Sequence, residues 1–325
     1  MTNKPLTKAE PPEPSEPDRP PGVGIFFPKP SVQTEIDPEH IFELPKTQNK
    51  NDRLYLDQLA WSEKHSTSIV PGTPIRVGLD LGTASVVLVV LDSRSEPLAM
   101  ARQKASVVRD GLVVDFAGAL AIGRFLRQTT EEALGVKLTR AAIAVPPGTG
   151  ERDAATHCYV CEGAGLEVDQ IFEEPTAANF FLGLKNGAIA DLGGGTTGAA
   201  VLSDRKLIAS FDEPTGGHHL SLVLAGHFKY SLERAENFKL DPVNRDTIAP
   251  VVAPVLSKMG RILKDGLAGH DVPLLCLVGG SAAAPGAGPI IAQETGLPVQ
   301  VFYQPELITP LGIAMGCNEY PAEKL

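Results

Sequence analysis

Two short segments of the chain place an aspartate at the end of an apolar run, followed by a turn rich in glycine and threonine. Residues 80–83 (Asp-Leu-Gly-Thr) follow one run, and residues 191–197 (Asp-Leu-Gly-Gly-Gly-Thr-Thr) follow another, 111 residues later. A second apolar run leaves each turn, at 85–91 and 198–202. Each segment therefore predicts a β-hairpin whose turn presents backbone N–H groups to an anion, because glycine has no Cβ in the way.

The two hairpins together indicate a nucleotide site more strongly than either one alone. A carboxylate at a strand end can hold a hydrated divalent metal, and the turn amides can bind phosphate. One such turn is common in β proteins, but two at domain-sized spacing can hold a polyphosphate from both sides. We therefore predict that they form a nucleotide clasp.

Three further segments supply groups that a nucleotide site needs. Glu174 precedes Pro175, Gly216 and Gly217 precede an expected helix, and residues 279–281 (Gly-Gly-Ser) follow an apolar strand. A helix N-terminus suits phosphate, and a glycine wall lets adenosine approach the backbone. The common phosphate loop Gly-x-x-x-x-Gly-Lys-Ser/Thr does not occur in the sequence, which argues against a P-loop enzyme.

Composition argues against nucleic acid and membranes as partners. The chain has 325 residues, enough for about two domains, and a net charge of −10 with no basic cluster to bind phosphate backbones. The polar N-terminal residues 1–10 do not form a signal peptide, and no stretch approaches 18 apolar residues. These features predict a cytoplasmic protein.

The pair Cys158 and Cys161 has the spacing of half a zinc site or of a redox pair. The interpretation as buried structural thiols is favoured, because both lie on one expected helix face and no second pair completes a ligand set.

Residues 1–74 are expected to form a proline-rich tail that is largely disordered. The first 45 residues hold 11 prolines, and such a composition buries too little surface to offset its ordering entropy. Two small apolar islands at 24–27 and 41–44 are candidate docking points, and residues 52–65 predict a short helix capped by Asp52. Two alternatives stay open: the segment packs on the same molecule, or it tethers a partner.

From residue 75 onward, apolar strands alternate with helices. Strands are expected at 97–104, 139–145, 168–172, 207–211 and 274–278. Helices are expected at 151–164, 176–184, 221–234 and 247–266, and residues 112–116 lead into a further helix that runs through 134. This alternation predicts an α/β fold with mixed sheets flanked by helices.

The order of these motifs resembles the superfamily of actin, sugar kinases and seventy-kilodalton heat-shock ATPases, over roughly residues 76–317. Residues 145–146, 164–167 and 174–178 (Glu-Pro-Thr-Ala-Ala) are similar to DnaK-like chaperones, whereas 110–116 and 235–239 resemble the cell-shape actin MreB. With 191–198 and 213–220 included, the chain most resembles the ethanolamine-utilisation EutJ family, which is described as chaperone-like and associated with bacterial microcompartments.

The resemblance implies an actin-like ATPase fold with two similar lobes and a nucleotide in the cleft between them. The first lobe would comprise 75–187 with 307–325, and the second 188–306. ATP and Mg²⁺ are the implied cofactors, with the metal held through water by Asp80 and Asp191. Glu174 is implied to activate the attacking water. Phosphate contacts are implied for Gly82, Thr83, Gly193, Gly194, Gly195, Thr196, Gly216 and Gly217. Adenosine contacts are implied for Gly279, Gly280, Ser281, Glu233 and Lys239.

The resemblance also has departures that bear on activity. The chaperones carry an acidic residue shortly after the double glycine, whereas residues 218–221 (His-His-Leu-Ser) offer none, and their phosphate-contacting lysine has no counterpart between Lys104 and Arg109. We therefore expect a slowly hydrolysing, chaperone-like switch with a protein partner, a microcompartment enzyme or shell protein. The alternative is a scaffold that does not hydrolyse ATP and that tethers cargo or shell through its tail. A small-molecule kinase is less favoured, since only Asp153 offers a base.

Overall fold

The computed structural model describes residues 50–325, and its first helix, α1 (Lys50–Ser62), precedes both sheets. The helix begins two residues before the expected start, so Asp52 lies within it and is not its cap. Leu56 and Leu59 are buried, at 2% and 0% exposure, so this helix packs on the body of the same molecule. The proline-rich segment and its two apolar islands lie outside the described residues.

The first sheet has the strand order β3-β2-β1-β7-β8, with β14 added beside β1. Its strands are β1 (Pro74–Leu81), β2 (Ser85–Asp92), β3 (Pro97–Lys104), β7 (Arg140–Val145), β8 (Glu167–Glu173) and β14 (Tyr320–Pro321). The first three form an antiparallel meander, and β7 and β8 run parallel to β1.

The second sheet repeats this plan in the order β11-β10-β9-β12-β13. Its strands are β9 (Gly187–Leu192), β10 (Thr197–Ser203), β11 (Lys206–Glu213), β12 (Leu275–Val278) and β13 (Val299–Val301). Again three strands form a meander and two run parallel to its first strand. Two small ribbons complete the strands: β4 (Val108–Arg109) with β5 (Leu112–Val113), and β6 (Val136–Lys137) with β15 (Glu323–Lys324). The first sheet with its helices is called the first lobe below, and the second sheet with its helices is called the second lobe.

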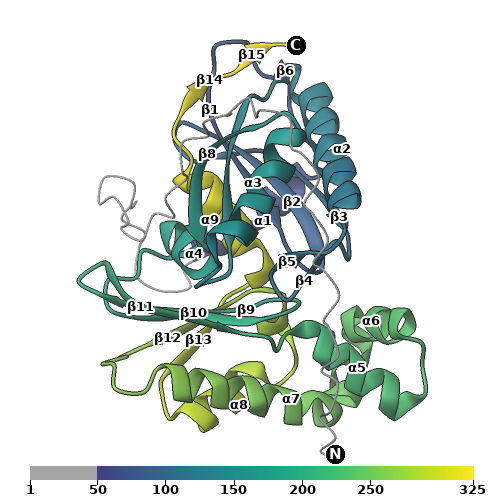
Figure 1. Cartoon of the computed structure of the whole chain (residues 1–325), viewed down its shortest axis with the longest axis vertical. Coiled ribbons are helices and arrows are strands. Elements are labelled where there is room, and N and C mark those ends of the chain that lie inside the picture. The colour runs from purple at the N-terminus through teal and green to yellow at the C-terminus, as the bar shows by residue number, and fades with distance from the viewer. Residues whose placement is uncertain (1–49) are drawn as a thin grey trace, which may run out of the picture. The chain divides into compact units, whose positions relative to one another are not determined.

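Helices cover both faces of each sheet, and Figure 1 shows α4 and α9 between the two sheets. The α-helices after α1 are α2 (Phe116–Leu134), α3 (Glu151–Gly163), α4 (Glu174–Leu182), α5 (Gly217–Phe228), α6 (Leu232–Leu240), α7 (Arg245–Gly266), α8 (Ala287–Thr295) and α9 (Ile308–Gly316). Short 3₁₀ turns are η2 (Pro242–Asn244), η3 (Gly280–Ala283) and η4 (Pro305–Leu307). Within residues 50–325, none of the helices has the length and apolar character needed to cross a membrane.

Strand alternation divides the apolar side chains into separate cores. In β2, Val86, Leu88 and Val90 join a core with α2 and α3, while the intervening Val87 and Val89 join a second core with α4 and α9. The second sheet also contributes to this central core through its inner face, and its outer face packs on α7 and α8. The layers are therefore α2/α3, first sheet, α4/α9, second sheet and α7/α8.

Helix α9 fits into this centre because glycine lets backbones approach closely. A Cβ on Gly312 would lie 2.0 Å from the carbonyl oxygen of Ala177 on α4, and a Cβ on Gly78 of β1 would lie 2.5 Å from the amide nitrogen of Ala314. These distances leave no room for a methyl group, so α9 is fixed against both α4 and β1.

We expect Gly312→Ala to destabilise the protein by about 2–3 kcal/mol, because overpacking at backbone atoms outweighs the better helix propensity of alanine. The matched control is Gly226→Ala in α5, where a Cβ would meet nothing within 4 Å. That variant should gain up to about 1 kcal/mol. The measurement is the midpoint of urea unfolding, and equal midpoints for the two variants would contradict this packing.

Candidate functional site

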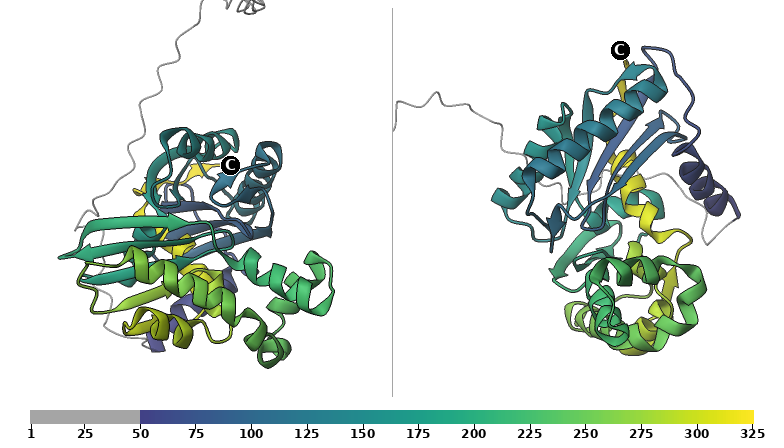
Figure 2. Two further views of the ribbon diagram at one scale, coloured as in Figure 1. Left: turned by 60° about the horizontal axis from the view of Figure 1, so that its bottom comes forward. Right: turned by 90° about the vertical axis from the view of Figure 1, so that its right-hand side faces the viewer.

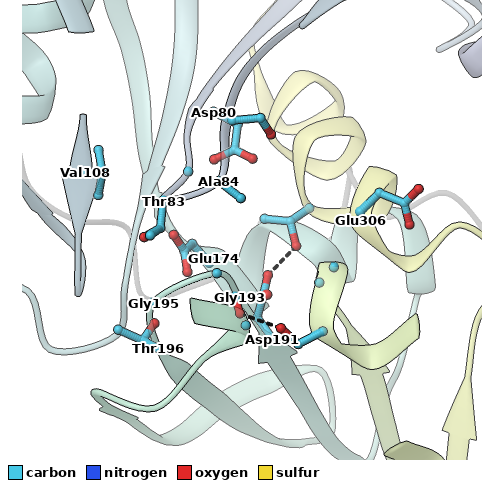
Figure 3. Close-up of a pocket in the computed structure, with 18 of the residues that line it drawn as sticks. Asp80, Thr83, Ala84, Val108, Glu174, Asp191, Gly193, Gly195, Thr196 and Glu306 are labelled. Carbon is cyan, nitrogen blue, oxygen red and sulfur yellow. Dashed lines mark hydrogen bonds between the residues drawn. The ribbon is translucent and has the colours of Figure 1, made fainter. Parts of the chain in front are cut away.

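Successive side chains of a strand point to opposite faces of its sheet, and this alternation directs Asp80 and Asp191 toward each other. In β1, Ile75, Val77 and Leu79 face the outer core with α2 and α3, so Asp80 lies on the opposite face. In β9, the alternate residues from Ala188 to Leu192 face the outer core with α7, so Asp191 also points to the centre. The two carboxylates therefore enter one space from two sheets, as Figure 3 shows.

The two predicted turns lie in direct contact. A Cβ on Gly194 would lie 3.2 Å from the amide nitrogen of Ala84, and a Cβ on Gly195 would lie 2.9 Å from both Thr83 Oγ1 and the amide nitrogen of Asp110. Only glycine allows this approach. The prediction of two facing turns is therefore correct in its geometry, and the hairpin β4–β5 closes one side of the contact.

The second turn presents amides that are available to an anion. In the described part of the chain, no acceptor receives a hydrogen bond from the amides of Gly194, Gly195 or Thr196, whereas the Gly193 amide donates to the Thr196 carbonyl at 3.0 Å. Three successive free N–H groups beside a cavity form a concave donor surface that suits phosphate oxygens.

The start of α5 differs from the prediction. The amides of Gly217 and His218 donate to the carbonyl oxygens of Gly193 and Gly194 at 2.9 and 2.7 Å, so they are not free for phosphate. Gly216 lies behind the turn, where a Cβ would be 2.5 Å from the carbonyl carbon of Gly195. The double glycine thus lets α5 pack against the turn at residues 193–196, which we call the phosphate turn after its predicted role, and support it.

Four carboxylates gather around this contact. Burial raises the pKa of each, and neighbouring carboxylates raise it further in three of them. Burial and then Asp191 raise the pKa of Asp80 from 3.8 to about 7. Burial, then Asp191, Asp80 and Asp212, hold the pKa of Glu174 well above its ordinary value. Burial raises the pKa of Asp191 to about 6, and a hydrogen bond from Thr309 opposes the rise.

Asp212 is a carboxylate that the sequence did not single out. It pairs with Gly198 across β10 and β11, and its Oδ1 atom is buried without a partner among the described residues. Burial raises its pKa to about 7, and a hydrogen bond from Thr196 opposes the rise. The phosphate turn is therefore backed by a further acidic group.

Hydrogen bonds between distant segments hold Asp191 and the turn that follows it in place. The Thr309 hydroxyl at the start of α9 donates to Asp191 Oδ2 at 2.6 Å, and the Ser281 hydroxyl donates to the Gly193 carbonyl at 2.8 Å. Gly279 has φ +83°, and a Cβ there would lie 2.2 Å from Asp191 Oδ1. A side chain at position 279 would therefore displace the aspartate.

A polar network on α5 and α6 forms another wall. Lys239 Nζ donates to Glu236 Oε2 at 2.8 Å, to Ser221 Oγ at 2.9 Å and to the Gly217 carbonyl at 3.1 Å. Glu233, which was predicted to act with Lys239, is exposed and does not line the cavity. Six helical residues turn it about 120° away from Lys239, whereas Glu236, three residues before Lys239, shares its face.

One cavity of about 280 Å³ unites most of the predicted residues. Its lining includes Asp80, Gly82, Thr83, Glu174, Asp191, Gly193, Gly194, Gly195, Thr196, Gly217, Lys239, Gly279, Gly280 and Ser281. Gly216 and Glu233 are outside it. Sequence reasoning missed the lining residues His157, Glu236, Arg245, Glu306 and Thr309. The spacing from Lys239 was a usable signal for Glu236, while Thr309 depends on how α9 docks.

No three histidine, cysteine or acidic side chains among the described residues are arranged to bind one metal ion together. Asp80 and Asp191 therefore suit a hydrated metal better than a fully protein-ligated one. Cys158 and Cys161 lie on α3, free and buried. Burial raises the pKa of Cys158 to about 11, so this thiol is protonated at neutral pH.

Comparisons with known proteins agree with this fold. A family model described as Hsp70 protein matches residues 119–245. The chain has a TM-score of 0.62 to a PilM-PilN type IV pilus biogenesis complex, at 16% identity, covering 75% of this chain and 98% of that one. It has a TM-score of 0.59 to MreB5 of Spiroplasma citri bound to AMPPNP, at 16% identity, covering 74% and 95%. The two lobes thus have the fold of the actin-like ATPases.

Closer relatives define the family. The chain is 42% identical to the ethanolamine utilization protein EutJ of Salmonella typhimurium, covering 77% of this chain and 88% of that protein. It is 45% identical to the crystal structure of EutJ from Carboxydothermus hydrogenoformans, with a TM-score of 0.74, covering 81% of this chain and 96% of that one. The chain belongs to the EutJ family.

We expect Asp80→Asn to stabilise the protein in the absence of nucleotide and metal at pH 8. The folded-state pKa of Asp80 is raised, so stability falls as pH rises from about 4 to about 7, where the buried carboxyl ionises. The full change in pKa would carry roughly 4 kcal/mol, but the side chain opens to the cavity, and we expect on the order of 2 kcal/mol.

The measurement is the urea midpoint of wild type and variant at pH 8 and pH 4. At pH 4 the carboxyl is neutral in the folded protein, so the two proteins should unfold at similar midpoints. A variant that is less stable at pH 8, or equally stabilised at both pH values, would show that Asp80 is not under electrostatic strain.

Proposed function

We propose that the chain binds Mg-ATP between its two lobes, hydrolyses it slowly, and acts as a chaperone-like switch associated with a bacterial microcompartment of the ethanolamine-utilisation type. The observation that carries this proposal is the contact of two aspartate-ended turns, one from each lobe, at a single cavity that also holds Glu174. The names of the EutJ relatives support the link to ethanolamine utilisation.

The donor set fits magnesium. Burial, and then neighbouring carboxylates, raise the pKa of Asp80 and of Glu174, and a bound divalent cation would favour their ionised forms. Asp80 and Asp191 would hold the ion through water molecules, and the ion would neutralise phosphate charge when bound. The free amides of Gly194, Gly195 and Thr196 would bind phosphate oxygens.

Glu174 is the residue that we assign to the attacking water. It is the first residue of α4, before Pro175, and it lines the cavity with both aspartates. A carboxylate whose pKa lies above the ordinary value is the stronger base, so it can take a proton from water more readily. Glu174 would orient the water and accept its proton.

At the other end of the cavity, Gly279, Gly280 and Ser281 would form the adenosine wall. Lys239 and Glu236 are held on the same helix face by their mutual hydrogen bond, so they are ordered before a ligand arrives. A charge pair of this kind can bind the hydroxyl groups of ribose. This arrangement supports adenosine contacts for residues 279–281 and Lys239, with Glu236 in place of Glu233.

Switching would follow from the division of these groups between the lobes. The first lobe supplies Asp80 and Thr83, and the second supplies Asp191 and the free amides. A metal-bound nucleotide contacts both sets only when the lobes are closed, so it favours the closed state. The chaperone-like role is supported by a chaperone protein HscA homolog from Burkholderia thailandensis, 28% identical over 58% of this chain and 39% of that protein.

A scaffold that binds nucleotide without hydrolysing it is the second candidate, and the charges of the cavity favour it. Among the described residues, the lysine and arginine side chains that line the cavity are Lys239 and Arg245. Lys239 is paired with Glu236, and Arg245 donates to the Ala283 carbonyl at 3.1 Å. The transferred phosphate would therefore lack a dedicated cation from these residues.

We expect Glu174→Gln to bind Mg-ATP within about threefold of wild type and to release phosphate at least roughly 100-fold more slowly, because a water-activating carboxylate is lost while the binding groups stay. Asp191→Asn should lose both binding and release. Glu167→Gln is the control, since Glu167 is exposed at the start of β8 and does not line the cavity.

The measurements are calorimetric titration with Mg-ATP and phosphate release on the same samples. Wild-type binding without any phosphate release would favour the scaffold. Phosphate release by Glu174→Gln at the wild-type rate would remove Glu174 from the mechanism, and unchanged binding by Asp191→Asn would refute the clasp.

A further inference from the structure

Helix α1 is anchored on the first lobe. Glu63 accepts a hydrogen bond from Arg102 of β3 at 2.9 Å, and the Tyr55 hydroxyl donates to the Ser95 carbonyl. Leu56 and Leu59 are buried in the central core with Met100 and its neighbours. Figure 2 shows α1 beside the strands of this lobe.

The same helix also bonds to the second lobe. Asp57 Oδ1 accepts hydrogen bonds from the Tyr303 hydroxyl at 2.9 Å and from Gln304 Nε2 at 3.1 Å. The guanidinium of Arg53 lies 5.6 Å from the centre of the Tyr303 ring, within the range of a cation–π contact. One turn of α1 thus holds the segment that follows β13.

That segment leads directly to the nucleotide cavity. Gln304 has φ +45°, a left-handed conformation that non-glycine residues seldom adopt, and it begins the turn η4. The next carbonyl, that of Pro305, accepts a hydrogen bond from the Gly279 amide at 2.9 Å, and Glu306 lines the cavity. The hydrogen bond from Gln304 to Asp57 and the hydrogen bond from Gly279 to Pro305 therefore connect Asp57 with the proposed adenosine wall.

We propose that α1 is a brace across the two lobes and that Asp57 is a positioning residue for the adenosine wall. By holding Tyr303 and Gln304, Asp57 fixes the turn that fixes Gly279, and it does so from a helix seated on the other lobe. The inference rests on the proposed function, in which residues 279–281 face adenosine.

The brace has a thermodynamic consequence. If seating of α1 favours the nucleotide-binding arrangement, then bound nucleotide favours seating of α1 by the same factor.

The experiment compares the full-length wild type with Asp57→Ala and Asp57→Asn, using Mg-ADP as the probe. We expect Asp57→Ala to bind Mg-ADP about three- to fivefold more weakly than wild type, since exposed polar contacts of this kind contribute little each. Asp57→Asn keeps the Oδ1 acceptor and should recover most of the affinity. Gln58→Ala is the matched control, because Gln58 is the exposed neighbour of Asp57 on α1 and is not the residue that binds Tyr303 and Gln304.

Hydrogen–deuterium exchange of α1 provides the second measurement. Saturating Mg-ADP should slow exchange in α1 of the wild type, and this effect should be lost in Asp57→Ala. If the wild type does not bind Mg-ADP, the proposed function itself is refuted. Normal binding of Mg-ADP with equal affinities for wild type, Asp57→Ala and Gln58→Ala would overturn the brace, and so would the lack of any effect of Mg-ADP on α1 exchange.

Discussion

The central physical constraint of the molecule is that several carboxylates are buried together where the two sheets meet. Asp80, Asp191 and Glu174 approach one another from three elements, and Asp212 adds a fourth negative group behind the phosphate turn. A protein optimised only for stability would not gather these groups, since burial raises the free energy of ionising all four, and neighbouring carboxylates raise it further for three of them. Under the proposed function a bound cation would make the arrangement favourable, and this would explain why the chain keeps four acidic groups in a buried place.

A duplicated sheet plan explains how the chain builds such a site. Both sheets have the same strand order, and in each the first strand of the meander ends in an aspartate on its inner face. The helices α4 and α9 then fill the space between the sheets. Thr309 on α9 donates to Asp191, so the central layer that joins the lobes also orients a group of the site.

Much of this could be predicted from the sequence because the signals are local. The hairpins follow from apolar runs and glycine turns, and strand period alone places Asp80 and Asp191 on inner faces. Glu236 was missed because its place in the cavity depends on which face of its helix docks. The hydrogen bonds from the α5 amides to the carbonyls of the second turn were missed because they join residues more than 20 positions apart. Asp212 and Thr309 reach the site only through strand register and helix docking, which no short motif encodes.

The most direct test of the central claim is the position of the metal in a crystal structure of the complex with Mn-ADP, read from the anomalous signal of manganese. The account predicts one ion about 4–5 Å from the carboxylates of both Asp80 and Asp191, as water-mediated coordination requires. An ion and nucleotide bound by one lobe alone, away from either aspartate, would contradict it.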